Sequence, residues 1–262
     1  MTDPVTPAPA IPIPPPLASP VTSRAVAAGR GSAWWSEAWR LFAAAPGPWL
    51  LIVLIILVLN VVLLVIPVVG HLAMQLLYPV FTGGLLLGCR AIDRGQPLTV
   101  NHLFAGFGER TGPLLILGLL SLVIATVITL AVAGILLVSF GAALFTHLLQ
   151  MQNLFTAAMA VGSAVLIGVS LFLLLALPLF MAMWYAPALI VLHGLEPWEA
   201  MKASFAGCLK NVLPFTIYSL IGFVLAIVAS IPLMLGWFVL GPMTMASIYT
   251  GYCDIFEDGA VS

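Results

Sequence analysis

Charged residues are scarce in this chain of 262 residues. Lys, Arg, Asp and Glu together make up 6% of the sequence, whereas hydrophobic residues make up 63% and the mean hydropathy is +1.20. A soluble domain carries about 25% charged residues, so this chain has too few to cover its surface in water. The composition therefore excludes a soluble globular domain and predicts an all-α, polytopic membrane protein.

Catalytic and metal-binding motifs are missing as well. The sequence contains no HExxH zinc motif, no Gly-x-Ser-x-Gly nucleophile elbow and no phosphate-binding loop with its Lys. Its three cysteines form no CxxC pair, and cytoplasmic thiols stay reduced, so we interpret Cys89, Cys208 and Cys253 as small apolar fillers. His193 lies near two glutamates, but it ends an apolar run, and the glutamates suit the start of the next helix. We expect no enzyme activity and no catalytic, cofactor-binding or metal-binding residues.

Charges are absent from three long stretches, residues 41–89, 111–195 and 211–253. A helix needs about 20 residues to cross roughly 30 Å of hydrocarbon, so the first and third stretches each accommodate two spans joined by an uncharged turn. A polar cluster, Thr146 to Asn153, divides the middle stretch into two long helices. These patterns predict six transmembrane helices. Whether the middle stretch also contains a periplasmic interfacial helix stays open.

The basic residues predict the orientation of the chain. All Lys and Arg residues lie outside the three stretches, and the outer turns contain none. Cytoplasmic loops carry an excess of Lys and Arg, so we expect both termini in the cytoplasm. Residues 1–30 are rich in Pro and Ala and predict a disordered cytoplasmic tail, which leaves a membrane domain over residues 31–257. The first apolar span begins near Pro48, unlike a signal peptide, so we expect this span to be retained.

Three parts of the membrane domain share one pattern, at about residues 31–95, 96–195 and 196–257. Each part begins with a short amphipathic helix, in which apolar residues recur at helical spacing. A span, an outer turn and a returning span follow. A proline interrupts each returning span, at Pro79, Pro187 and Pro242. Each unit crosses the membrane twice, so all three share one orientation, and we expect a pseudo-threefold axis along the membrane normal.

Four segments resemble those of a family of uncharacterised proteobacterial six-span integral membrane proteins: Ala38–Trp49, Leu85–Phe107, Trp184–Asn211 and Tyr252–Phe256. The sequence is also distantly similar to the membrane domain of glycerophosphodiester phosphodiesterases. The resemblance covers about residues 30–257 and implies a bacterial inner-membrane protein. It brings no known activity and no catalytic residues, and the catalytic domain of those phosphodiesterases is absent.

Apart from Ser and Thr, whose hydroxyls can bond to carbonyls of their own helix, three polar residues stand inside the predicted spans: Asn60, His71 and Gln75. Polar groups inside a membrane are costly and often functional. His71 and Gln75 are four residues apart, so they share one helix face. These residues are candidates either for interhelical hydrogen bonds, worth about 0.6 to 2 kcal/mol each, or for lining a ligand site, and we favour the first interpretation. The tryptophans are interpreted as an aromatic belt at the membrane boundary.

Two functions fit this sequence. The first is a non-enzymatic structural or accessory component of the bacterial envelope, which acts with a membrane protein partner or as a homo-oligomer. The second is a carrier or binding protein for a lipid, a quinone or another amphiphilic small molecule, held in a seam between the units. The lipid bilayer is a partner in both cases. We expect no cofactor and no nucleic-acid partner.

Overall fold

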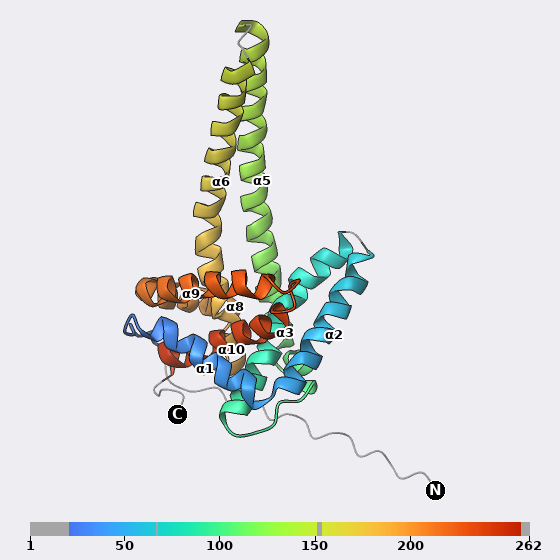
Figure 1. The fold of residues 1–262 in the computed structure, drawn as a ribbon, viewed down its shortest axis with the longest axis vertical. Helices are drawn as coiled ribbons and strands as arrows, with labels where there is room; N and C mark the ends of the chain where they lie inside the picture. Colours follow the sequence, from blue (N-terminus) through green and yellow to red (C-terminus); the bar gives the residue numbers. More distant parts are fainter. Residues whose placement is uncertain (1–20, 67, 151–153, 258–262) are drawn as a thin grey trace.

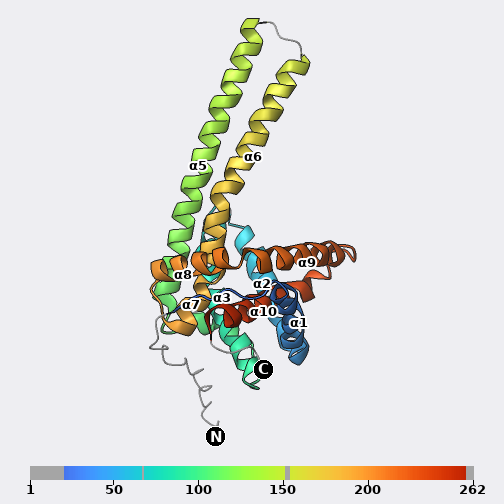
Figure 2. The same cartoon turned by 90° about the vertical axis from the view of Figure 1, so that its left-hand side faces the viewer.

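The computed structural model of the chain describes residues 21–66, 68–150 and 154–257. Within these ranges the secondary structure is helical, without a strand. Three helical hairpins extend from a common base in different directions, and Figures 1 and 2 show the second rising far above the others. Their helices are α2 (Pro46–Leu64) with α3 (Val69–Asp93), α5 (Thr111–Gln150) with α6 (Leu154–Trp184), and α9 (Val212–Ser230) with α10 (Trp237–Phe256).

A leading segment precedes each hairpin. These segments are α1 (Arg30–Ala44), α4 (Asn101–Phe104) with the 3-10 turn η1 (Ala105–Phe107), and α8 (Pro197–Lys210). α1 packs on α9 and α10, α4 and η1 pack on α3, and α8 packs on α6 and on the short helix α7 (Ala186–His193). The order is cyclic, because the first segment covers the third hairpin, the second covers the first, and the third covers the second.

The core lies where the returning helices meet. The residues that follow the three prolines are buried almost without a break, and the fully buried runs are 79–91 in α3, 185–193 leading into α7, and 246–256 in α10. Both α7 and α10 pack on α3. We call these three runs the hub. Pro187 stands in the first turn of α7, where its missing N–H leaves no helical bond unmade, so the returning helix ends at Trp184 and starts again beyond it.

Outside the hub the helices expose large apolar side chains, mainly on α2, α5, α6 and α9. Five helical segments of the described chain are long and apolar enough to cross a membrane: Pro46–Leu64, Val69–Asp93, Thr111–Thr146, Ala158–His193 and Val212–Ser230. α10 is not among these five, because polar residues such as Tyr249, Tyr252 and Asp254 lower the hydropathy of its second half. The sixth span and the three tandem units therefore stay predictions.

The middle apolar stretch forms two long helices, as its sequence predicts. α5 has 40 residues and α6 has 31. The predicted polar cluster begins inside α5 at Thr146, and its last residues, 151–153, lie outside the described residues. Gly168 of α6 lets the two helices approach, because an added Cβ would lie 2.4 Å from the Leu136 side chain of α5.

The outer turns of the first and third hairpins share one geometric requirement. Their sequences are IPVVG, ending at Gly70, and IPLMLG, ending at Gly236. A Cβ added at Gly70 would lie 1.8 Å from the carbonyl oxygen of Leu63, and one added at Gly236 would lie 2.4 Å from the Cα atom of Ala229. Each turn therefore brings the returning helix so close to the outgoing backbone that only glycine fits.

Candidate functional site

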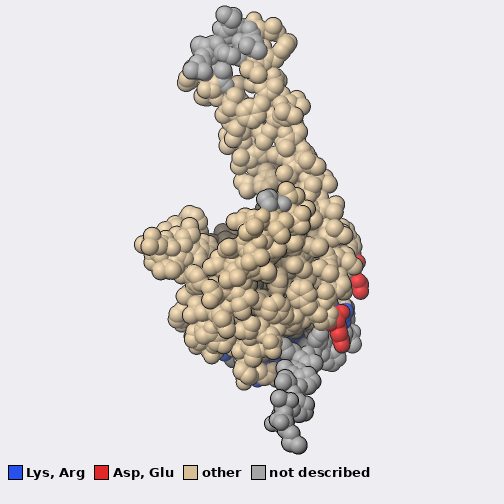
Figure 3. Space-filling view, turned by 90° about the vertical axis from the view of Figure 1, so that its right-hand side faces the viewer, with Lys and Arg blue, Asp and Glu red and all other residues tan. Residues whose placement is uncertain are grey.

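Polar side chains gather where the hub meets the leading segments. Figure 3 shows that the charged side chains visible on that face lie well away from the tip of the α5–α6 hairpin. We call this group the inner polar cluster. It combines residues of α1, α3, α7 and α10 with the residue that follows α10, and its members are Arg30, Trp34, Arg90, His193, Tyr252, Asp254 and Glu257.

The first centre of the cluster is Asp254 of α10, whose side chain is buried. Its carboxylate accepts a hydrogen bond from Trp34 Nε1 at 2.7 Å and pairs with the guanidinium of Arg30. Arg30 also donates to Glu37 at 2.7 Å. Burial raises the pKa of Glu37 above that of an ordinary glutamate, although the bond from Arg30 opposes this shift. Asp254 thus fastens α1 to α10 through charge-assisted bonds, which are stronger than neutral ones.

The second centre is Arg90 of α3, which is buried and pairs with Glu257 just beyond α10. The hydroxyl of Tyr252 donates to the Glu257 carboxylate at 3.1 Å and lies 2.5 Å from Nδ1 of His193. His193 is also buried and ends α7. One connected set of side chains therefore joins all three runs of the hub.

A third link lies at the end of α3. Asp93 accepts a hydrogen bond from the Tyr249 hydroxyl of α10 at 3.1 Å and lies 3.6 Å from the guanidinium of Arg40 on α1. The Arg40 side chain is about half exposed. A salt bridge that is open to solvent contributes little, about 0–1 kcal/mol, so we assign the stabilising role here mainly to the Tyr249 bond.

Asn211, between α8 and α9, holds the segment that precedes α1. Its Oδ1 accepts from the backbone N–H of Val26 at 2.8 Å, and its Nδ2 donates to the carbonyls of Arg24 at 2.9 Å and Gly207 at 2.8 Å. Residues 1–20 of the predicted disordered tail lie outside the described residues. Residues 21–29, the part that the structure describes, are tied to the membrane domain by these bonds.

The sequence singles out three polar residues, and in the structure none of them belongs to the inner polar cluster. Asn60 is exposed, and its Nδ2 donates to the Ile56 carbonyl of its own helix at 2.8 Å. His71 is exposed and Gln75 is partly exposed on α3. Their proposed roles, in interhelical bonding or in lining a ligand site, stay predictions.

The sequence did not reveal the inner polar cluster. Its charged members lie at the ends of apolar runs, where they look like ordinary boundary charges. The tryptophan belt needs correction at three positions, because Trp34, Trp35 and Trp49 are buried in the fold. Their Nε1 atoms donate to Asp254, to the Tyr218 carbonyl at 3.0 Å and to the Leu41 carbonyl at 3.3 Å. Burying an indole requires a partner for its N–H, and these bonds supply one.

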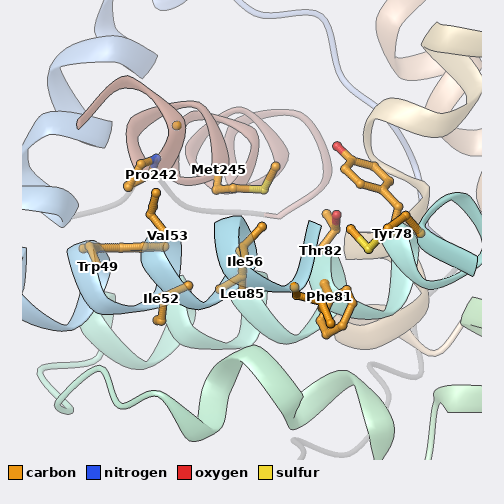
Figure 4. Close-up of a pocket in the computed structure, with 13 residues that line it drawn as sticks. Trp49, Ile52, Val53, Ile56, Tyr78, Phe81, Thr82, Leu85, Pro242 and Met245 are labelled. Carbon is orange, nitrogen blue, oxygen red and sulfur yellow. The ribbon is translucent and has the colours of Figure 1, made fainter. Parts of the chain in front are cut away.

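An apolar groove of about 240 Å³ lies between α2, α3 and α10. Figure 4 shows Trp49 near one end and Tyr78 near the other, with Pro242 and Met245 of α10 across from α2. The lining is almost entirely apolar, and Asn60, His71 and Gln75 are not part of it. The full lining is Trp49, Ile52, Val53, Ile56, Leu59, Met74, Tyr78, Phe81, Thr82, Leu85, Gly241, Pro242 and Met245.

Apolar helices that surround a hub with partly buried ion pairs define an all-helical membrane protein. The chain is similar to a protein of Burkholderia thailandensis that is named a probable inner membrane protein. The two are 29% identical over 215 residues, which cover 77% of this chain and 75% of that protein. No family model and no solved structure matches the chain. The similarity to the membrane domain of glycerophosphodiester phosphodiesterases is not shown by these matches and stays a prediction.

Proposed function

We propose that this chain is an integral inner-membrane protein that acts as a non-enzymatic structural or accessory component of the bacterial envelope. The observation that carries the proposal is that the buried polar groups bond one helix to another. Asp254 and Asn211 each bond to residues far away in the sequence, and Arg90 pairs across the hub with Glu257. These groups fix helices in place, and the relative from Burkholderia thailandensis supports the inner-membrane location.

The proposal includes six spans in three tandem units, with both termini in the cytoplasm. The cyclic packing of the leading segments on the hairpins supports three equivalent units. The shared glycine requirement of the first and third outer turns supports the same arrangement. The basic residues outside the apolar stretches support a cytoplasmic location for the hub end.

Cysteine labelling tests this topology. Gln96, after α3, and Leu233, in the turn between α9 and α10, are exposed, and the three native cysteines are buried, so the background is low. A membrane-impermeant maleimide should label Leu233→Cys in spheroplasts and Gln96→Cys only in inverted vesicles. A reporter fused to the C-terminus should stay cytoplasmic. A periplasmic reporter would show that α10 does not cross, and the six-span proposal would be wrong.

The functional proposal is tested by native mass spectrometry of the protein released directly from its own membranes. A structural or accessory component should appear bound to another protein or to further copies of itself. The same protein carrying Asp254→Asn, which loosens the hub, should lose that assembly. A monomer without any protein partner, released under conditions that keep a known membrane complex intact, contradicts the proposal.

A second candidate function is the binding or carriage of a lipid, a quinone or another amphiphilic molecule. The specific observation in its favour is the apolar groove between α2, α3 and α10. In the same measurement, a small-molecule adduct without a protein partner favours this candidate. Asn60→Leu combined with His71→Phe should remove that adduct if these residues orient a polar head, and should leave it if the groove alone holds the ligand.

A further inference from the structure

The groove between α2, α3 and α10 is about as long as the hydrocarbon of one membrane leaflet is thick. Its lining runs from Trp49 to Leu59 along α2, a rise of about 15 Å at 1.5 Å per residue. The hydrocarbon core of a bilayer is about 30 Å thick, so one leaflet contributes roughly half of that depth. The lining residues of α3, from Met74 to Leu85, cover a similar rise. The length of the groove therefore matches the depth of hydrocarbon that an acyl chain occupies in one leaflet.

The lining selects hydrocarbon over water. An apolar cavity of about 150 Å³ in a protein stays dry and takes up benzene, and this groove measures about 240 Å³. Its hydroxyls, on Tyr78 and Thr82, lie toward one end (Figure 4). α2 and α3 are both long and apolar enough to cross a membrane, so the molecules that meet the groove mouth are lipids.

The other end of the groove lies toward positive charge. Trp49 is bonded to the Leu41 carbonyl of α1, which places that end beside α1. Arg40 of α1 and Arg94, just after α3, are exposed beyond this end, and the Asp93 carboxylate that pairs with Arg40 leaves a net positive charge of one on these three residues. Cationic side chains at the membrane surface attract anionic lipid headgroups, by about 1 kcal/mol each. A phospholipid with its tail in the groove has its phosphate on this side.

We propose that the groove holds one acyl chain of a phospholipid from the leaflet on the hub side, with the phosphate near Arg40 and Arg94. This inference rests on the membrane placement proposed above. It goes beyond that function because it assigns a lipid site at defined residues. The site recognises the chain by shape and length and the headgroup by charge.

Gly241 offers a way to fill the groove from one side. It lines the groove in α10, and a Cβ added there meets no atom within 4 Å. Gly241→Leu therefore adds a side chain at the groove whose Cβ meets no neighbouring atom. Gly134 of α5 is also helical and open, with no atom within 4 Å of an added Cβ, so Gly134→Leu is the matched control. Val53→Phe narrows the groove from α2 and serves as the second variant if Gly241→Leu does not fold.

The experiment uses the full chain in vesicles of phosphatidylethanolamine and phosphatidylglycerol that contain a phospholipid with a diazirine at the middle of one acyl chain. After photolysis, mass spectrometry should find the label concentrated on groove residues such as Ile56, Met74 and Met245. Gly241→Leu should lower this labelling about tenfold, the change produced by roughly 1.4 kcal/mol, and Gly134→Leu should not. Arg40→Gln should reduce the preference for phosphatidylglycerol.

Two outcomes overturn the inference. They are even labelling over all exposed apolar helices and unchanged groove labelling in Gly241→Leu. Resistance to carbonate extraction reports membrane integration separately. If the chain is integral but the groove is not labelled specifically, the lipid site fails while the proposed function stands. If the chain is extracted, the membrane placement itself fails.

Discussion

The hydroxyl of Tyr252 lies 2.5 Å from Nδ1 of His193, and this contact joins α10 to the end of α7 inside the hub. The same hydroxyl reaches Glu257, the partner of Arg90 on α3. The phenol of Tyr252 thus contacts His193, which is 59 positions away in the sequence. Because both side chains are buried, the contact also holds the end of α7 against α10.

Replacing this hydroxyl should destabilise the protein. Tyr252→Phe leaves the ring in place but removes a hydrogen-bond partner from the buried His193 and the partly buried Glu257, which costs about 1–3 kcal/mol. Chemical unfolding in lipid bicelles measures the loss. Tyr78→Phe is the control, because Tyr78 is about half exposed on α3. Equal stability of Tyr252→Phe and the unchanged chain would show that the hydroxyl of Tyr252 makes no net contribution.

The Arg30–Asp254 pair offers a test of charge pairing. Asp254→Asn leaves Arg30 opposite a neutral side chain, and breaking a buried pair in this way costs about 3–5 kcal/mol; we expect the lower end, because Arg30 is partly exposed. Adding Arg30→Leu in a background of Glu37→Gln, which removes the other carboxylate that pairs with Arg30, should recover part of the loss. A double-mutant cycle of unfolding free energies measures the coupling, and purely additive losses would argue against it.

Close approach of α1 to α9 depends on Gly31. A Cβ added there would lie 2.1 Å from the Pro214 carbonyl oxygen, so Gly31→Ala should force the helices apart and destabilise by about 1–3 kcal/mol or more. Gly47→Ala in α2 meets no atom within 4 Å and should instead be neutral or stabilise by about 0.5–1 kcal/mol. Thermal unfolding of both variants checks that the melting temperature falls for Gly31→Ala and does not fall for Gly47→Ala.

His102 should make stability depend on pH. It is buried in α4, and burial lowers its pKa below that of an ordinary histidine. As the pH falls through about 6.5, the unfolded chain takes up a proton that the folded chain does not, so the unfolding free energy decreases. Titration of stability between about pH 7.5 and 5.5 should therefore show a smaller loss for His102→Gln than for the unchanged chain. His71→Gln, at an exposed position, is the control substitution.

Asn211 should protect the segment that precedes α1 from proteases. Asn211→Leu removes its bonds to the backbone of Val26 and Arg24, so trypsin should cleave after Arg24 about tenfold faster, as expected for the loss of roughly 1.4 kcal/mol of local stability. Lys202→Gln, on the exposed part of α8, is the control. Peptide mapping of timed digests measures the rate, and equal cleavage in both variants would contradict the role of Asn211.

Local patterns predicted most of the helices, whereas the contacts between them required the structure. The positions of the prolines identify the returning helices, and the lengths of the charge-free stretches identify the two long helices. Both features can be read from residues that are close together in the sequence. The buried face of α1 was only partly predicted. Helical spacing places Trp39 on the same face as Trp35, yet Trp39 is about half exposed and Trp34 is buried. That choice depends on α9 and α10, which meet α1 from two sides, and nothing within residues 30–44 records their position.

The same reasoning explains why the candidate site was missed. Arg90 and Asp254 stand next to apolar runs, as boundary charges do, and only the returning helices bring them to partners far along the chain. Asn60, by contrast, looked unusual because it interrupts an apolar run, but a neighbouring carbonyl on its own helix satisfies its amide nitrogen. An isolated polar residue is conspicuous in a sequence, whereas a long-range pair is not.

The length of the α5–α6 hairpin has a consequence for the surrounding bilayer. α5 contains 40 residues, so it is about 60 Å long, roughly twice the thickness of the hydrocarbon. An upright α5 would leave half of its apolar surface outside the hydrocarbon, and full immersion would need a tilt of about 60°, beyond the usual range of 0–40°. Such hydrophobic mismatch deforms the lipids near the helix. The hairpin should therefore thicken the membrane locally and draw the protein toward regions that are already thick.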